Sequence, residues 1–329
     1  MDKPATPSDT WYQDTRQSVD AAVEWAFSHI ERFSPFDESD CYDPSRLKVF
    51  VEFSIMLATY LKLTQDRQPA DNWRAVKLVR SVCKRADFTD RTIRSPEILV
   101  EFAELCGVLR ELGFQDLELR RRIQSAVDAG LVEQIERLPH RLLEVRVSLD
   151  WAGAVYSLPP MGELISETIL GRPLCTPLLS REAVYAVTHV VMFATRFGLR
   201  QWSLPPQVPI TRTRAVLCDL IVIACQDTDW DLLGELLLCW DCLGFEPSPL
   251  TAAAWVSFLS ARQDDGTFLP RPLGPGGVTE TNSKDGSTSN QPVDERASKA
   301  DDFDLVYHTT LVAILAGTVR IHRTDLNVT

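Results

Sequence analysis

The sequence predicts an all-α fold, and three kinds of signal lead to that prediction. Apolar residues recur with helical spacing along almost the whole chain, and hairpin signals such as Asn-Gly between alternating strands are absent. Helix starts carry a capping side chain before a proline, as at Asp43-Pro44 and Ser248-Pro249. Helix ends are marked by glycine. Together these signals divide the chain into about twelve helices.

The individual helices follow in chain order. A capping residue before proline begins the second, fourth and eleventh helices. Gly113, Gly198, Gly244 and Gly317 end the fourth, eighth, tenth and twelfth. The helical period of the apolar residues sets the remaining boundaries. The predicted helices span 16–33, 44–63, 71–87, 96–112, 116–135, 140–155, 160–171, 181–197, 210–225, 229–243, 249–262 and 303–319.

Composition narrows the class of protein. The chain has 329 residues, of which 45% are hydrophobic and 24% charged, as in an ordinary globular protein. The net charge of −12 argues against nucleic acid or an anionic membrane as a partner, because both would be repelled. No secretory signal begins the chain, and the apolar stretch 215–225 is too short to span a bilayer. We therefore expect a cytoplasmic protein with no membrane span.

The cysteines indicate neither a disulfide framework nor a zinc site. Eight cysteines are scattered mostly among apolar neighbours, which favours reduced, buried thiols. Cys239 and Cys242 form a Cys-x-x-Cys pair, but no second pair that would complete a zinc site is nearby. We expect these thiols to pack in the core.

Alternate helices share a register, which indicates an internal repeat. His189 stands nine residues before Gly198, and His308 stands nine before Gly317. The same offset was applied to the other alternate helices, with Pro159 taken as the stop of the sixth. The residues selected by this register are Glu52, Glu104, Asp150, His189, Glu235 and His308.

Six helical hairpins of about 45 residues each fit a closed (α/α)6 toroid. In that fold six inner helices surround a central cavity and six outer helices cover them. We expect a single domain over residues 1–329, with the six selected side chains projecting into the cavity at one level. Trp151 and Tyr307 would line the same cavity, where aromatic rings stabilise a cation or stack on a flat ligand.

A polar insert separates the last two predicted helices. Residues 274–302 contain too few apolar side chains to form a core, so we expect a flexible loop. The insert leads into the helix that carries His308 and would therefore lie at the cavity mouth. It is either a lid over the site or a tolerated surface insertion.

The last predicted hairpin resembles that of the terpenoid-cyclase and protein-prenyltransferase toroids. In those proteins an outer helix ends in a Gln-x-x-x-Gly-aromatic turn, and the next inner helix opens with Tyr-His-Thr. Gln263, Gly266 and Phe268 are similar to the turn in tighter spacing, and the segment 307–309 reads Tyr-His-Thr. The resemblance covers about fifty residues strongly and implies the fold more than the activity.

The resemblance also implies two alternative chemistries. In the prenyltransferases the histidine is a zinc ligand beside an Asp-x-Cys pair, but this chain has Asp229-x-Asp231, without the thiolate that favours zinc. The run from Asp227 to Asp231 also resembles the Asp-x-Asp-Asp proton donor of the cyclases, although Trp230 takes the donor position. Acidic residues at a helix start are also explained by capping alone.

The register offers a further chemistry. His308, His189 and Glu235 would lie on three consecutive inner helices, a set that could bind a divalent metal or divide acid and base roles. In the acid–base alternative His308 is the general base, His189 is the general acid, and Glu235 orients them. Asp229 and Asp231 would lie at the mouth.

The chain also resembles an uncharacterised family of actinobacterial proteins, some of which are found among natural-product biosynthesis genes. The segments 43–56 and 188–198 carry this resemblance. We therefore expect an enzyme of bacterial specialised metabolism that acts on a small, largely apolar substrate by acid–base chemistry, including cyclisation. The alternatives are a cyclase or prenyltransferase-like catalyst using the aspartate run, and a non-catalytic binding or partner protein.

Overall fold

The prediction of an all-α protein is confirmed. The computed structural model describes residues 7–65, 70–201, 204–272 and 302–328. Over these residues the chain forms helices joined by turns, and its only β structure is two isolated bridges. The predicted insert at 274–302 lies outside the described residues except for Asp302, which begins the last helix.

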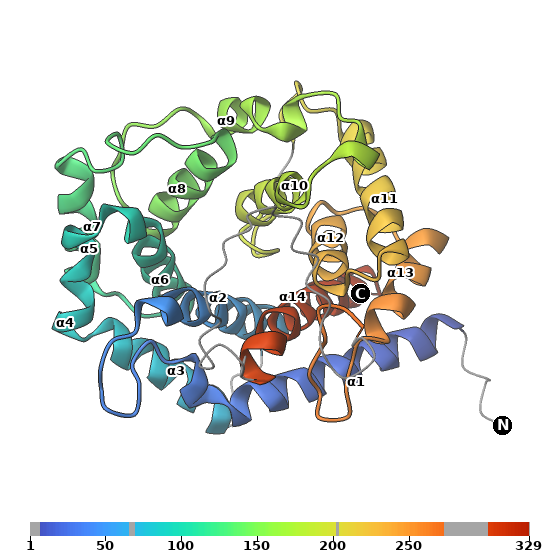
Figure 1. Ribbon diagram of the computed structural model, residues 1–329, viewed down its shortest axis with the longest axis horizontal. Coiled ribbons are helices and arrows are strands. Elements are labelled where there is room, and N and C mark those ends of the chain that lie inside the picture. Colours follow the sequence, from blue (N-terminus) through green and yellow to red (C-terminus); the bar gives the residue numbers. More distant parts are fainter. Residues whose placement is uncertain (1–6, 66–69, 202–203, 273–301, 329) are drawn as a thin grey trace, which may run out of the picture.

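Six helices form a closed cycle of contacts. Each packs against the next in chain order, and the last packs back against the first. Figure 1 shows them following one another around the centre of the molecule. They are α2 (Leu47–Thr64), α6 (Leu99–Glu111), α8 (Pro139–Ala152), α10 (Arg181–Ala194), α12 (Trp230–Cys242) and α14 (Asp302–Val328).

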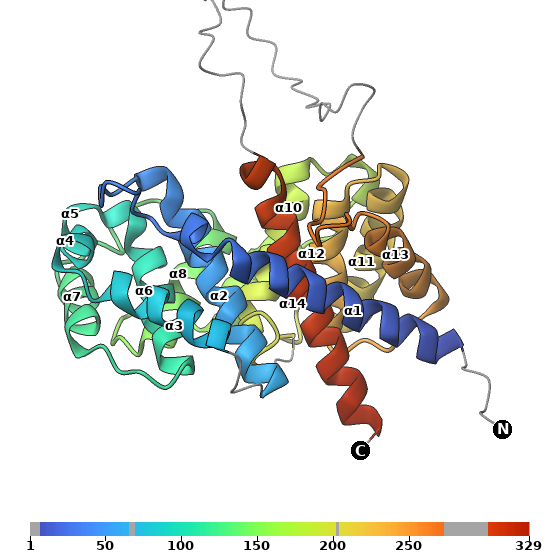
Figure 2. The same ribbon diagram turned by 90° about the horizontal axis from the view of Figure 1, so that it is seen from below.

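The remaining long helices lie outside this cycle, each against one or two of its members. In Figure 2, α1 crosses α14 on the outside of the molecule. The outer helices are α1 (Pro7–Ser28), α3 (Ala70–Cys83), α7 (Leu117–Asp128), α9 (Met161–Glu167), α11 (Ile210–Gln226) and α13 (Pro249–Leu259). Two single-turn helices, α4 (Ala86–Thr89) and α5 (Arg91–Arg94), connect α3 to the 3-10 turn that precedes α6.

Capping side chains begin the helices that carry the site. Ser180 accepts a hydrogen bond from the amide of Ala183 at the start of α10, and Asp229 accepts one from Leu232 at the start of α12. The first amides of a helix have no intrahelical acceptor, and each of these side chains supplies one. The starts of these helices are therefore fixed by local sequence.

Several predicted helix ends are wrong, among them those of the first, fifth, sixth and twelfth helices, which end at Ser28, Asp128, Ala152 and Val328. The helix predicted at 140–155 ends at Ala152, because Gly153 takes the left-handed conformation with φ of 75°. Gly317 does not end a helix, since α14 continues to Val328. At Gly317 a Cβ would overlap Cγ2 of Val19, so this glycine allows α1 to approach α14 closely.

This contact predicts an effect on stability. Gly317→Ala should reduce the free energy of unfolding by about 1 kcal/mol, because overpacking outweighs the better helix propensity of alanine. Denaturant unfolding measures the loss. In a Val19→Ala background the clash is gone, so the same substitution should become neutral or stabilising; an equal loss in both backgrounds contradicts this explanation.

Helix α14 is the one helix of the described residues that is long and apolar enough to cross a membrane. Most of its apolar stretch is buried, between α12 on one side and α1 and α2 on the other. Burial of this kind is expected of a core helix, which agrees with the prediction that no membrane is spanned.

Candidate functional site

The N-terminal halves of five inner helices surround one cavity of about 960 Å³. Most lining residues come from the first two or three turns of α2, α8, α10, α12 and α14, and the rest from residues between 167 and 172 and from Pro270, so these N-terminal ends share one face of the cycle. Helix N-termini favour nearby negative charge, which suits the first-turn residues Glu182, Asp231 and Asp304. The polar lining includes Lys48, Glu52, His140, Arg141, Glu182, Tyr185, His189, Asp231, Glu235, Asp304, Tyr307, His308 and Thr309.

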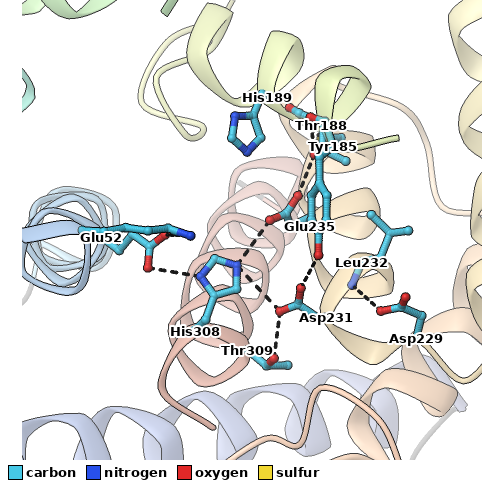
Figure 3. A network of polar contacts seen from close by, with 12 residues as sticks. Glu52, Tyr185, Thr188, His189, Asp229, Asp231, Leu232, Glu235, His308 and Thr309 are labelled. Atoms are coloured by element: carbon cyan, nitrogen blue, oxygen red, sulfur yellow. Dashed lines mark hydrogen bonds and ion pairs between the residues drawn. The ribbon is translucent and has the colours of Figure 1, made fainter. Parts of the chain in front are cut away.

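His308 is the centre of a polar cluster that joins three helices (Figure 3). Its Nδ1 lies 3.2 Å from Glu52 Oε2 on α2. Its Nε2 lies 3.4 Å from Glu235 Oε1 and 3.6 Å from Asp231 Oδ1, both on α12. One imidazole therefore faces three carboxylates from two neighbouring helices.

This arrangement determines the charge of His308. Burial alone lowers the pKa of the imidazole, but the carboxylates of Glu52, Glu235 and Asp231 raise it well above its usual value. In return, although burial raises the pKa of Glu52 and of Asp231, pairing with His308 brings both below their usual values. His308 is thus an imidazolium at neutral pH, which argues against the predicted role of general base.

The two carboxylates on α12 are held by three hydroxyl groups, of which only that of Thr309, in the Tyr-His-Thr segment, belongs to a motif noted in the sequence. Tyr185 donates to Asp231 Oδ2 at 2.7 Å, and Thr309 donates to Oδ1 at 2.8 Å. Thr188 donates to Glu235 Oε2 at 2.6 Å. Tyr185 and Thr188 lie just before His189 on α10. In the sequence, only this closeness to a residue of the repeat register pointed to a role for them in the site.

His189 has a different partner from the one expected. Its Nδ1 lies 2.7 Å from Glu144 Oε1 on α8, and Arg141 contacts the same carboxylate at 2.8 Å. Burial raises the pKa of Glu144, but His189 and Arg141 together bring it below its usual value. The ionised carboxylate accepts a hydrogen bond from the Nδ1–H of His189, which leaves Nε2 as the ring nitrogen outside this contact.

Glu144 was missed because the sixth predicted helix was counted from the wrong stop. Glu144 stands nine residues before Gly153, the glycine that ends α8. Counting from Pro159 selected Asp150 instead. The repeat register was therefore informative, but the helix end was misassigned.

The structure does not bring Asp150, Trp151 or Glu104 to this cavity. Asp150 accepts a hydrogen bond from Tyr156 at 2.6 Å, and Trp151 is buried; both line a separate pocket near the ends of α6 and α8. Glu104 is buried below the cavity, 3.4 Å from the hydroxyl of Ser148. Burial, with Glu101 and Glu144 nearby, raises the pKa of Glu104 well above its usual value, so this carboxyl is protonated.

The aspartate run divides into three separate roles. Asp227 is exposed at the end of α11. Asp229 is buried, caps α12, and forms ion pairs with Arg181 and, at 2.6 Å, with Arg271. Only Asp231 lines the cavity. The contacts of Asp229 are those of a structural residue, and the run does not act as one unit.

The histidines and Glu235 are not arranged as a metal site. His308 contacts Glu235, but the Nδ1 of His189 is engaged by Glu144. In the described part of the chain, no group of three His, Cys, Asp or Glu side chains is placed to hold a metal ion. Cys239 and Cys242 are free, and burial raises the pKa of both thiols, as expected of packed cysteines.

Comparison with known proteins assigns the chain to a family. A family model described as "Domain of unknown function (DUF6895)" matches residues 19–318. No curated protein and no solved structure matches the chain. The matched residues run from α1 into α14 and include all five helices that line the cavity. The chain therefore belongs to the DUF6895 family.

Proposed function

We propose that the protein is an enzyme that transfers protons to and from a small molecule bound in the cavity, with His189 as general base. The observation that carries the proposal is the Glu144–His189 pair. The carboxylate fixes Nδ1 at 2.7 Å, while Nε2 has no hydrogen bond among the described residues. A carboxylate that orients a histidine and stabilises its imidazolium is the usual way to prepare such a base.

His308 is proposed as the general acid. It carries a proton at neutral pH, and its Nε2 lies 3.4 Å and 3.6 Å from its two carboxylate neighbours. These distances exceed the range of about 2.7–3.2 Å for a good N–H···O hydrogen bond. A substrate oxygen that approaches Nε2 therefore competes with weak contacts only.

The cavity wall suits a mixed substrate. Apolar and aromatic side chains, among them Ile169, Tyr185, Leu305 and Tyr307, share the lining with the charged groups. This combination favours a small, largely apolar molecule that carries one oxygen-containing functional group. We propose that such a substrate is processed in bacterial specialised metabolism, by proton transfer that includes cyclisation, as the resemblance to proteins of biosynthetic gene clusters suggests.

We also infer that the helices form an (α/α)6 toroid. The closed cycle of six helices, their outer partners and the shared face of N-terminal ends support this inference. The alternative catalyst based on the aspartate run has weaker support, because Asp229 is occupied by Arg181 and Arg271.

A metabolite screen in D₂O tests the proposed function. The protein is incubated with a library of small oxygenated, largely apolar compounds, and conversion or deuterium uptake is followed by mass spectrometry. We expect conversion of at least one compound, with the rate falling at least about tenfold in His189→Gln and in Glu144→Gln. His322→Gln, the same substitution on α14 outside the cavity lining, should keep the wild-type rate.

Two outcomes contradict the proposal. Equal conversion rates in wild type and His189→Gln would remove His189 from the chemistry. If no compound is converted but one raises the melting temperature of the wild type, the protein binds without catalysis.

A further inference from the structure

A second pocket, of about 450 Å³, lies at the opposite ends of three inner helices. Arg110 lies in the last turn of α6, Trp151 in the last turn of α8, and Arg196 just after α10. The cavity with His189 is formed instead mainly by the N-terminal halves of the inner helices. The remaining lining residues of the second pocket are Glu111, Gly113, Phe114, Gln115, Asp150 and Arg200.

The arginines of this pocket form no ion pair within 4.0 Å in the described part of the chain. The whole chain has 46 acidic and 34 basic residues, so carboxylates are abundant. Even so, no salt bridge within 4.0 Å is recorded among the described residues for Arg110, Arg196 or Arg200. Burial, the positive charge of Arg200 and that of Arg110 lower the pKa of Arg196, and the negative charges of Glu111 and Asp150, which line the same pocket, oppose this shift. The three arginines therefore share the pocket with two carboxylates and form an ion pair with neither.

The two acidic residues of the pocket are engaged elsewhere. Glu111 lies 3.9 Å from Lys62 and accepts a hydrogen bond from the indole of Trp151 at 3.2 Å. Asp150 accepts a hydrogen bond from Tyr156 and lies 4.0 Å from Arg146. Because both carboxylates already have partners, the guanidinium groups are the charged groups of this pocket that remain to bind a ligand.

Backbone geometry and an aromatic neighbour place Arg196. Arg196 and Phe197 both have left-handed backbone conformations, with φ of 46° and 54°. Such conformations are costly for residues other than glycine and persist only where the surrounding structure enforces them. The guanidinium lies 5.9 Å from the centre of the Trp151 ring. Arg110 lies in the last turn of α6, where the helix dipole favours a positive charge, and it donates a hydrogen bond to the Trp151 carbonyl at 2.7 Å. Neither interaction explains why Arg196 and Arg200 lie in the same pocket.

We propose that this pocket is a second binding site, for a small molecule that carries an oxyanion group next to an apolar or aromatic part. Guanidinium groups bind carboxylates and phosphates through paired hydrogen bonds. Arg196 and Arg200 bind the oxyanion, and Phe114 and Trp151 contact the apolar part. The site is independent of the chemistry proposed for His189.

Calorimetric titration with phenyl phosphate and benzoate tests the site and separates phosphate from carboxylate ligands. We expect at least one probe to bind at millimolar concentration or below, and its Kd to rise at least about tenfold in Arg196→Gln and in Arg200→Gln. Arg196→Lys and Arg200→Lys, which keep the charge but lose the planar fork, should also bind more weakly.

Two matched controls locate the binding. Arg172→Gln and His189→Gln change the lining of the first cavity and should leave the Kd unchanged. Absence of binding by both probes overturns the proposal. So does a Kd that rises in Arg172→Gln or His189→Gln but stays constant in all four arginine variants of the second pocket.

Discussion

Replacing His308 with glutamine should lower the free energy of unfolding at pH 7 by about 3 kcal/mol, the lower end of the range for breaking a buried ion pair. Without the imidazolium, Glu235 loses its cationic partner, while Asp231 keeps Arg181 at 3.6 Å and Glu52 keeps Lys48 at 3.5 Å. The lower end applies because the His308 side chain is 31% exposed. Urea unfolding of wild type and variant measures the difference.

The pH dependence identifies the cause. The pKa of His308 is raised in the folded protein, so its stabilisation is present below its usual pKa and is lost as pH rises through the raised value. The pKa values of Glu52 and Asp231 are lowered, so their share is lost as pH falls through those lowered values. The gap between wild type and variant should therefore be widest at mildly acidic pH, between the usual pKa values of the carboxylates and of histidine, and narrow on both sides. A gap that stays constant with pH, or that also appears in His322→Gln, contradicts an ionic origin.

Asp229→Ala should reduce the free energy of unfolding by about 2 to 3 kcal/mol. The substitution removes the cap of α12, worth about 1 kcal/mol, and leaves Arg181 and Arg271 without their shared buried carboxylate. Both arginines are about one-third exposed, which limits the second contribution. Chemical unfolding measures the total.

Asp229→Asn separates the two contributions. Asparagine caps a helix as well as aspartate does but cannot pair with arginine, so it should be about 1 kcal/mol less damaging than alanine. In the proposed acid–base enzyme, Asp229→Asn should keep most of its activity. Loss of conversion with unchanged stability would instead assign Asp229 to the chemistry, as the cyclase-like alternative requires.

Most of the fold could be predicted from the sequence because helical periodicity and caps are local properties. The exceptions have definite physical causes. Gly153 and Pro159 are both plausible helix stops, and only the left-handed backbone at Gly153 shows where α8 ends. Gly317 looks like a stop, but its function is close packing against Val19, a contact across nearly the whole chain that local sequence does not encode.

The site could be predicted in part. The register selected Glu52, Glu235 and His308, which the structure brings together. It did not indicate that His189 would pair with Glu144, because such pairing depends on the rotation of neighbouring helices. The sequence also could not separate Asp229 from Asp231, since both are acidic residues at a helix start, and only the positions of Arg271 and Tyr185 distinguish them.

The side chains that line the cavity lie in the first two or three turns of five helices, together with residues between 167 and 172 and Pro270. The later turns of the same helices pack against their neighbours and close the cycle of six. The lining of the cavity and the packing that closes the cycle therefore fall largely on different parts of each helix. If the cavity binds a small molecule as proposed, substitutions on one wall would change which molecule fits while the later turns keep their packing.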